Sequence, residues 1–175
     1  LRQRCAGSTL THRERKGQGE RAPRVQVHRR PGTPAAILVS FPATVSSSEE
    51  IHLILNPTAG RGRAAALRPR ISRFFEERGA RAVWHVTRRP GHASQIVGEL
   101  PPGLPAVAVG GDGTVHEVAR ACAGTGRPMG VLPAGSGNDY VKALGIGGDL
   151  RRAMEVVLAG EARAVDAGEV NGEFF

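Results

Sequence analysis

Three glycine-bearing segments in this chain carry the residue types that bind phosphate. They are residues 56–64 (Asn-Pro-Thr-Ala-Gly-Arg-Gly-Arg-Ala), 110–117 (Gly-Gly-Asp-Gly-Thr-Val-His-Glu) and 133–139 (Pro-Ala-Gly-Ser-Gly-Asn-Asp). Each follows a short apolar run that is typical of a strand, and the first two precede a run with helical spacing. Glycine lets backbone N–H groups approach an anion, and a helix N-terminus adds partial positive charge. Because three such segments occur in one chain, the pattern predicts a nucleotide phosphate site.

The carboxylate of Asp112 is the strongest candidate for chemistry within these segments. A carboxylate among phosphates is otherwise repulsive, so it normally holds Mg²⁺ or accepts a proton from an attacking hydroxyl. Thr114 could cap the following helix or donate its hydroxyl to a phosphate. The alternative is that Asp112 only caps a helix beside a structural glycine turn, and the residues alone leave both interpretations open. Asp139 is explained by helix capping, for which its residue type is suited.

A fourth cluster covers residues 87–93, Thr-Arg-Arg-Pro-Gly-His-Ala. Thr87 ends an apolar run, where its hydroxyl could reach an adenine or a ribose. His92 opens the next helical run, and we interpret it as a cap or a surface residue. Arg61 and Arg63, in the first segment, could meet phosphate oxygens or remain solvated on an exposed loop.

Alternating strands and helices must position these segments. Apolar runs predict strands at 51–55, 82–86, 106–109, 129–132 and 163–167, with a further one beginning at 172–175. Helical spacing and breakers predict helices at 64–78, 92–100, 114–123, 139–144 and 149–158. Pro69 should be tolerated only near the first turn of its helix. Repeated strand–helix–strand units indicate an α/β fold, a mainly parallel sheet with helices on both faces. Ligands bind such sheets at the carboxyl ends of the strands, where all three segments lie.

Charge and composition limit the other functions. Residues 1–48 carry nine Lys or Arg and two Glu, a net charge of +7, whereas the remaining residues are nearly balanced at +1. The basic pI therefore belongs to a leader that we expect to be disordered, and no nucleic-acid partner is expected for the domain. Cys5 and Cys122 are too far apart in sequence to form a ligand-like cluster, and Cys122 is interpreted as a small core residue.

The ends of the chain carry further expectations. No apolar stretch reaches the ~20 residues that span a bilayer. The first methionine is Met129, so we expect the leader to be partly upstream reading frame. The alternative is a basic arm that touches anionic lipid or nucleic acid. The expected organisation is a leader at 1–48, a nucleotide-binding domain at 49–170, and the beginning of a second domain at 171–175.

Three common nucleotide and hydrolase motifs are absent from the sequence. It contains no Gly-x-x-x-x-Gly-Lys-Ser/Thr loop and no Gly-x-Gly-x-x-Gly that opens the first helix with an acidic residue about 20 positions later. It also has no Gly-x-Ser-x-Gly nucleophile elbow. The first absence argues against a Walker-type enzyme, the second against a dinucleotide dehydrogenase and the third against an α/β-hydrolase.

The four clusters, in this order, resemble the diacylglycerol kinase catalytic-domain family from about Ile51 to the last residue. The carrying motifs are Asn-Pro-x-x-Gly-x-Gly, Thr-x-x-Pro-Gly-His-Ala, Gly-Gly-Asp-Gly-Thr-x-x-Glu-Val and Pro-x-Gly-Ser-Gly-Asn-Asp. The family includes bacterial diacylglycerol and lipid kinases and the sphingosine and ceramide kinases. Gly-Gly-Asp-Gly-Thr alone is less specific, because NAD kinases and phosphofructokinases share it. The resemblance implies a phosphofructokinase/NAD kinase-like nucleotide-binding domain.

The resemblance also implies an activity: ATP-dependent phosphorylation, with Mg²⁺, of a hydroxyl of diacylglycerol or a related lipid. Asp112 would be the catalytic residue and the metal partner. The residues that would line the ATP site are Asn56, Pro57, Thr58, Ala59, Gly60, Thr87, Gly110, Gly111, Asp112, Gly113, Thr114, Val115, His116 and Ser136. His116 stands where family members more often have asparagine.

The family further implies a cytoplasmic enzyme in peripheral contact with a membrane, where its lipid substrate lies. Relatives continue into a second, β-rich domain, which we expect to be missing beyond Phe175, so that this fragment alone would catalyse little. Two alternatives remain: a NAD or sugar kinase of the same architecture, and a non-catalytic nucleotide-binding fragment.

Overall fold

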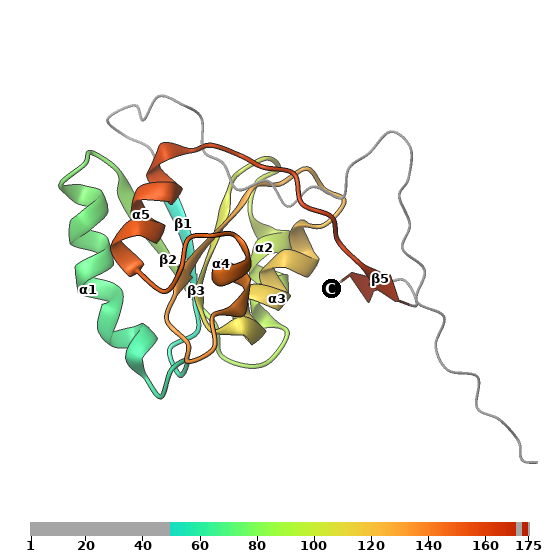
Figure 1. The fold of residues 1–175 in the computed structure, drawn as a ribbon, viewed down its shortest axis with the longest axis horizontal. Coiled ribbons are helices and arrows are strands. Elements are labelled where there is room, and N and C mark those ends of the chain that lie inside the picture. The colour runs from blue at the N-terminus through green and yellow to red at the C-terminus, as the bar shows by residue number, and fades with distance from the viewer. Residues whose placement is uncertain (1–49, 171–172, 175) are drawn as a thin grey trace, which may run out of the picture.

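Four strands pair into one parallel sheet in the order β2-β1-β3-β4 (Figure 1). Their bounds are β1 Glu50–Leu55, β2 Arg81–Val86, β3 Ala106–Gly110 and β4 Met129–Pro133. The structure is a computed structural model that describes residues 50–170 and 173–174. The predicted leader, residues 1–48, lies outside the described residues, as does most of the segment 171–175.

Helices cover both faces of the sheet. They are α1 Arg63–Glu76, α2 His92–Glu99, α3 Asp112–Cys122, α4 Asp139–Ala143 and α5 Leu150–Ala159. Helices α1 and α5 pack on one face, and α2 and α3 pack against each other on the opposite face (Figure 1). The prediction of an α/β fold with a mainly parallel sheet and helices on both faces is therefore confirmed. None of the helices in the described residues is both long and apolar enough to cross a bilayer.

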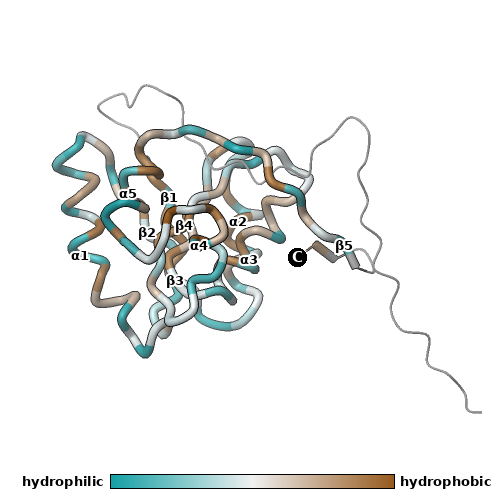
Figure 2. The backbone as a smooth tube through the Cα atoms, viewed as in Figure 1, coloured by the Kyte–Doolittle hydropathy of each residue, from teal (hydrophilic) through white to brown (hydrophobic). Residues whose placement is uncertain are grey.

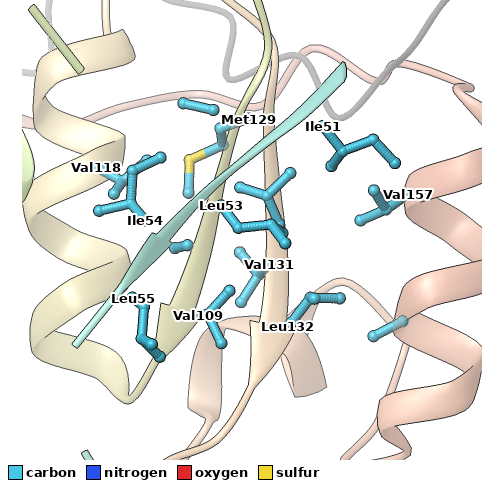
Figure 3. Close-up of a cluster of buried hydrophobic side chains, with 14 of the residues drawn as sticks. Ile51, Leu53, Ile54, Leu55, Val109, Val118, Met129, Val131, Leu132 and Val157 are labelled. Atoms are coloured by element: carbon cyan, nitrogen blue, oxygen red, sulfur yellow. The ribbon is translucent and has the colours of Figure 1, made fainter. Parts of the chain in front are cut away.

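The core lies around the two central strands, β1 and β3. Leu53, Ile54, Val107 and Val109 are fully buried, as a strand covered on both faces requires. Ile54 points toward Val118 of α3, whereas Ile51 points toward Val157 of α5 (Figure 3). Hydrophobic residues are concentrated along the strands and on the inner sides of the helices (Figure 2).

Cys122 belongs to the same core, as its sequence context predicted. It is a free cysteine and fully buried. Burial raises the pKa of its thiol to about 12, so it remains protonated at neutral pH.

Two local predictions are wrong. Residues 163–167 form no strand; instead β5 Glu169–Val170 pairs in antiparallel fashion with β6 Glu173–Phe174. The predicted segment has only small or exposed side chains apart from Val165, so it offers little apolar surface to bury in a sheet. Pro69 lies inside α1 rather than near its first turn. Pro69 and Ala65, whose carbonyl loses its helical donor, are both exposed, so water can satisfy that carbonyl.

Candidate functional site

The loops that follow the four parallel strands meet at one edge of the sheet. Hydrogen bonds between neighbouring strands continue beyond the strand ends: Thr87 N donates to Leu55 O at 2.8 Å, and Asn56 N donates to Val109 O at 3.1 Å. The strand order reverses between β1 and β3, the point at which open α/β sheets bind ligands. All four clusters identified in the sequence follow these strands, so the fold brings them together.

The four loops enclose a pocket of about 650 Å³. Most of the residues predicted for the nucleotide site line it: Asn56, Pro57, Thr58, Ala59, Gly60, Thr87, Gly111, Asp112, Gly113, Thr114 and Ser136. Its lining also includes residues that the prediction did not name for the site: Arg88, Arg89, Pro90, Ala93, Glu117, Gly135 and Gly137.

Three predicted residues do not line the pocket. Gly110 is buried at the end of β3, where a Cβ would lie 2.5 Å from Thr114 Oγ1. Val115 is buried in the core, and His116 is exposed on α3. The helical period explains this, because Gly113, Thr114 and Glu117 share one side of α3 while the two intervening residues point elsewhere.

The first loop is shaped by left-handed backbone. Asn56 Oδ1 accepts hydrogen bonds from the Thr58 N–H at 3.1 Å and the Thr58 hydroxyl at 2.9 Å. Gly60, Arg61 and Gly62 then have φ values of 60°, 59° and 86°. A Cβ on Gly60 would overlap the Ala134 carbonyl oxygen, so this loop touches the end of β4 through a position that only glycine fits. Arg61 is exposed outside the pocket lining.

The third loop is closed by Asn138. Its Oδ1 accepts the Gly135 N–H at 3.1 Å, and its Nδ2 donates to the Gly135 carbonyl at 2.9 Å. Asn138 has φ of 54°, a conformation that asparagine tolerates better than most residues. A Cβ on Gly135 would overlap the Cα of Gly111, so the second and third loops are in direct backbone contact.

Asp112 joins the second and third loops. Its Oδ2 accepts the Asn138 N–H at 3.1 Å, and its Oδ1 accepts the Asp139 N–H at 2.8 Å. The carboxylate therefore caps α4 rather than its own helix, whose N-cap residue is Gly111. The expectation that Asp139 caps α4 is wrong: Asn138 is the N-cap residue, and the Asp139 side chain pairs with Lys142 at 2.8 Å.

Glu117 joins the second loop's helix to the fourth cluster. Its two carboxylate oxygens accept the N–H groups of Gly91 at 2.9 Å and Ala93 at 3.0 Å. Sequence reasoning included Glu117 in the family motif but gave it no role at the site. Its spacing from Gly113 and Thr114, four and three residues, was the available signal, because it places all three on one side of a helix.

Cationic and polar groups line the wall between β2 and α2. Arg88 and Arg89 border the pocket, and Arg89 Nη2 donates to Gln95 Oε1 at 2.7 Å. His92 is the first residue of α2, and its Nδ1 accepts the Arg88 N–H at 3.1 Å. His92 thus stabilises the bend that leads into the helix, although Gly91 is the N-cap residue.

The donor set fits a magnesium ion that is held mainly by a bound phosphate. Among the described residues, no group of three or more His, Cys, Asp or Glu side chains could hold a metal on its own. Mg²⁺ in phosphate-transferring sites is usually bound by one or two carboxylates together with phosphate oxygens and water. Each Asp112 oxygen accepts one amide N–H and keeps a further lone pair, so this carboxylate remains able to bind a metal.

Comparisons with known proteins agree with the motifs. The chain is 38% identical over 128 residues to a diacylglycerol kinase of Bacillus subtilis, covering 70% of this chain and 42% of that protein. It is 39% identical over 104 residues to the probable lipid kinase YegS of Escherichia coli, covering 56% and 35%. The chain thus spans less than half the length of these curated relatives.

Solved structures show the same likeness. The fold resembles a putative diacylglycerol kinase from Bacillus anthracis with a TM-score of 0.57 and 26% identity, covering 75% of this chain and 50% of that one. Residues 50–170 match the family described as the diacylglycerol kinase catalytic domain, as the sequence motifs predicted. The chain therefore belongs to the diacylglycerol kinase catalytic domain family.

Proposed function

We propose that this chain is the nucleotide-binding half of an ATP-dependent lipid kinase, which transfers the γ-phosphate to a hydroxyl of diacylglycerol or a related lipid. The observation that carries the proposal is the single pocket that four loops form at the carboxyl ends of β1 to β4. Its volume, about 650 Å³, lies within the range of small-molecule and cofactor sites. Family membership supports the kinase chemistry.

The first turn of α3 is suited to bind phosphate. The N–H groups of Thr114 and Val115 both donate to the Gly111 carbonyl. The N–H groups of Asp112 and Gly113 come earlier in the helix and have no intrahelical acceptor, so they are available to an anion. Arg88 and Arg89 add positive charge from the β2–α2 loop, which lines the same pocket. Positioned amides and cations of this kind supply most of the catalysis in phosphoryl transfer.

Asp112 would be the residue that holds Mg²⁺ against the phosphates. When bound, Mg²⁺ would neutralise the charge on the transferring group. Hydrogen bonds to Asn138 and Asp139 hold the carboxylate in one orientation, which favours a positioned ligand over a freely moving proton acceptor. Asp112 would also keep the second and third loops at a fixed separation during the reaction.

The proposed substrates determine where the protein would act. Diacylglycerol and related lipids lie in membranes and ATP lies in the cytoplasm, so we place the protein in the cytoplasm in peripheral contact with a membrane surface.

Two measurements test the proposal. Calorimetry of the chain with ATP and Mg²⁺ should detect binding at a one-to-one ratio. The full-length protein should transfer label from γ-labelled ATP to diacylglycerol in mixed micelles, with sphingosine, ceramide and NAD as competing acceptors. Absence of ATP binding by a folded sample would contradict the proposed function. Label on NAD but on no lipid would favour the NAD kinase alternative, and binding without any transfer by the full-length protein would favour a non-catalytic nucleotide-binding module.

A further inference from the structure

Helix α2 has its N-terminus capped by a side chain from another helix. Its N-cap residue, Gly91, provides no side-chain cap, and the first turn of α2, which is fully described, has no acidic residue. The carboxylate of Glu117, on α3, takes this place by accepting the Gly91 and Ala93 N–H groups. Such a carboxylate satisfies two otherwise unpaired donors and interacts favourably with the helix dipole.

A third hydrogen bond fixes the same two helices. The Ser94 hydroxyl donates to the backbone carbonyl of Glu117 at 2.7 Å. Helices α2 and α3 also pack along each other on one face of the sheet (Figure 1). Main chain and side chain of Glu117 are therefore both bound to the first turn of α2.

Glu117, with its hydrogen bonds to α2, lies between two segments that line the pocket. Thr87 to Pro90 form one wall and lead directly into Gly91, the first residue that Glu117 binds. Gly113 and Thr114 line the pocket from α3, one helical turn before Glu117. The Glu117 carboxylate thus helps to set the position of the β2–α2 loop relative to the phosphate-binding turn of α3.

The hydrogen bonds of Glu117 also reduce the repulsion that its negative charge would exert on a phosphate ligand. Glu117 lines a pocket for which we propose a triphosphate ligand, and a carboxylate there would repel such a ligand. Because both oxygens accept N–H groups at a helix N-terminus, the charge is partly balanced where it lies.

We propose that Glu117 is a positioning residue for nucleotide binding: it holds the β2–α2 loop at the distance from α3 that the nucleotide requires. This inference rests on the proposed function. It concerns a residue that acts through Gly91 and Ala93, not through contact with the reacting atoms.

Glu117→Gln is the direct test, because glutamine has the same shape but only one acceptor oxygen. Its NH₂ group would face one of the two N–H groups. The loss of one charged hydrogen bond should raise the Kd for ATP about tenfold. It should also speed hydrogen exchange of the amides at residues 91–94. Fluorescence of Trp84, the only tryptophan of the chain, reports whether the variant is folded.

Two further variants make the test specific. Ser94→Ala removes the hydroxyl bond to Glu117 from a residue outside the pocket lining, and should raise the Kd about threefold through loop position alone. Asp149→Ala removes the N-cap of α5, because Oδ1 of Asp149 accepts the Arg151 N–H at 2.9 Å. It should lower stability like any lost cap without changing the Kd.

The outcomes separate this inference from the proposed function. If the native chain binds ATP and Glu117→Gln binds it equally well, the inference is wrong and the proposed function stands. If Glu117→Gln weakens binding but Ser94→Ala does not, or Asp149→Ala weakens it equally, the effect does not come from loop position and the inference is again wrong. If the folded native chain binds no ATP, both fail.

Discussion

Asp112, the first residue of α3, accepts the backbone N–H of Asp139, the first residue of α4, at 2.8 Å. The second Asp112 oxygen accepts the neighbouring Asn138 N–H. One carboxylate therefore occupies the N-terminus of a helix 27 residues away in sequence while it lines the pocket of its own loop. Its structural and proposed catalytic roles are combined in the same two atoms, so a substitution there must be measured for both.

Asp112→Asn should nearly abolish phosphate transfer without unfolding the protein. The asparagine oxygen can accept one of the two N–H groups, whereas its NH₂ group faces the other. We expect the free energy of unfolding to fall by about 1 kcal/mol, since both bonds are solvent-exposed. Urea denaturation of the chain followed by Trp84 fluorescence measures stability, and transfer of labelled phosphate to diacylglycerol by the full-length protein measures activity.

Asp139→Asn is the matched control for Asp112→Asn. Its side chain lies outside the pocket lining and pairs only with exposed Lys142 among the interactions described, while its N–H remains available to Asp112. Loss of such a surface pair changes stability by less than about 1 kcal/mol. Full turnover in Asp112→Asn, or equal losses in both variants, would contradict the role assigned to Asp112.

Gly135→Ala should be strongly destabilising, whereas Gly113→Ala should not. An added methyl at Gly135 overlaps the Cα of Gly111, and a backbone contact cannot be relieved by a change of rotamer. We expect a loss of about 2 kcal/mol. At Gly113, inside α3, a Cβ meets nothing within 4 Å, so alanine should stabilise the protein by about 0.5 kcal/mol. Urea midpoints compare the two, and similar midpoints would show that the second and third loops are not in contact.

Local pattern was enough to predict the elements with strong apolar runs. The runs 51–55 and 106–109 became β1 and β3, which are buried on both faces, and the rule for ligand sites in parallel sheets placed the loops that follow them. The strand predicted at residues 163–167 was wrong because the segment offers little apolar surface to bury in a sheet.

The roles of Asp112 and Glu117 depend on contacts between distant segments. Asp112 binds amides 26 and 27 residues away, and Glu117 binds amides 26 and 24 residues away. The motif identified Asp112 as a polar group at a strand end. The position of α4 relative to Asp112 cannot be predicted from the spacing of residues within that motif. His116 was assigned to the site by resemblance, although its place on α3 points it to solvent.

Acidification should destabilise the protein through the pair His52 and His85. His52 Nδ1 lies 3.0 Å from His85 Nε2, and burial lowers the pKa of both side chains below the ordinary value of 6.5. Nearby Arg127 and Arg81 lower the His52 pKa further, while Glu50 opposes them. Below about pH 6.5 the unfolded chain binds protons that the folded chain does not, so stability falls as the pH drops through the folded pKa values.

Urea denaturation between about pH 5 and pH 7.5 measures this dependence. The double variant His52→Asn, His85→Gln should flatten the curve, because neither replacement titrates in this range. His116→Gln, at an exposed position of α3, is the control and should leave the slope as in the native protein. A slope unchanged in the double variant would assign the pH dependence to other groups.

Arg127→Met should lower the free energy of unfolding by more than the same substitution at any surface arginine. Arg127 is only 8% exposed, and its guanidinium donates to the carbonyls of Leu104 at 2.5 Å and Leu100 at 3.0 Å. It thereby joins the end of α2 to the segment that enters β3. Methionine fills a similar volume but leaves both carbonyls without this donor, so we expect a loss of about 3 kcal/mol.

Arg127→Lys separates the geometry of this contact from its charge. Lysine keeps the charge, but its compact ammonium lacks the planar fork that reaches two carbonyls, so it should recover only part of the loss. Arg70→Met, at an exposed position of α1, should change the free energy of unfolding by less than about 0.5 kcal/mol. Full recovery by lysine would mean that the charge, not the two carbonyl bonds, stabilises the fold at this position, since only the bonds depend on the shape of the guanidinium.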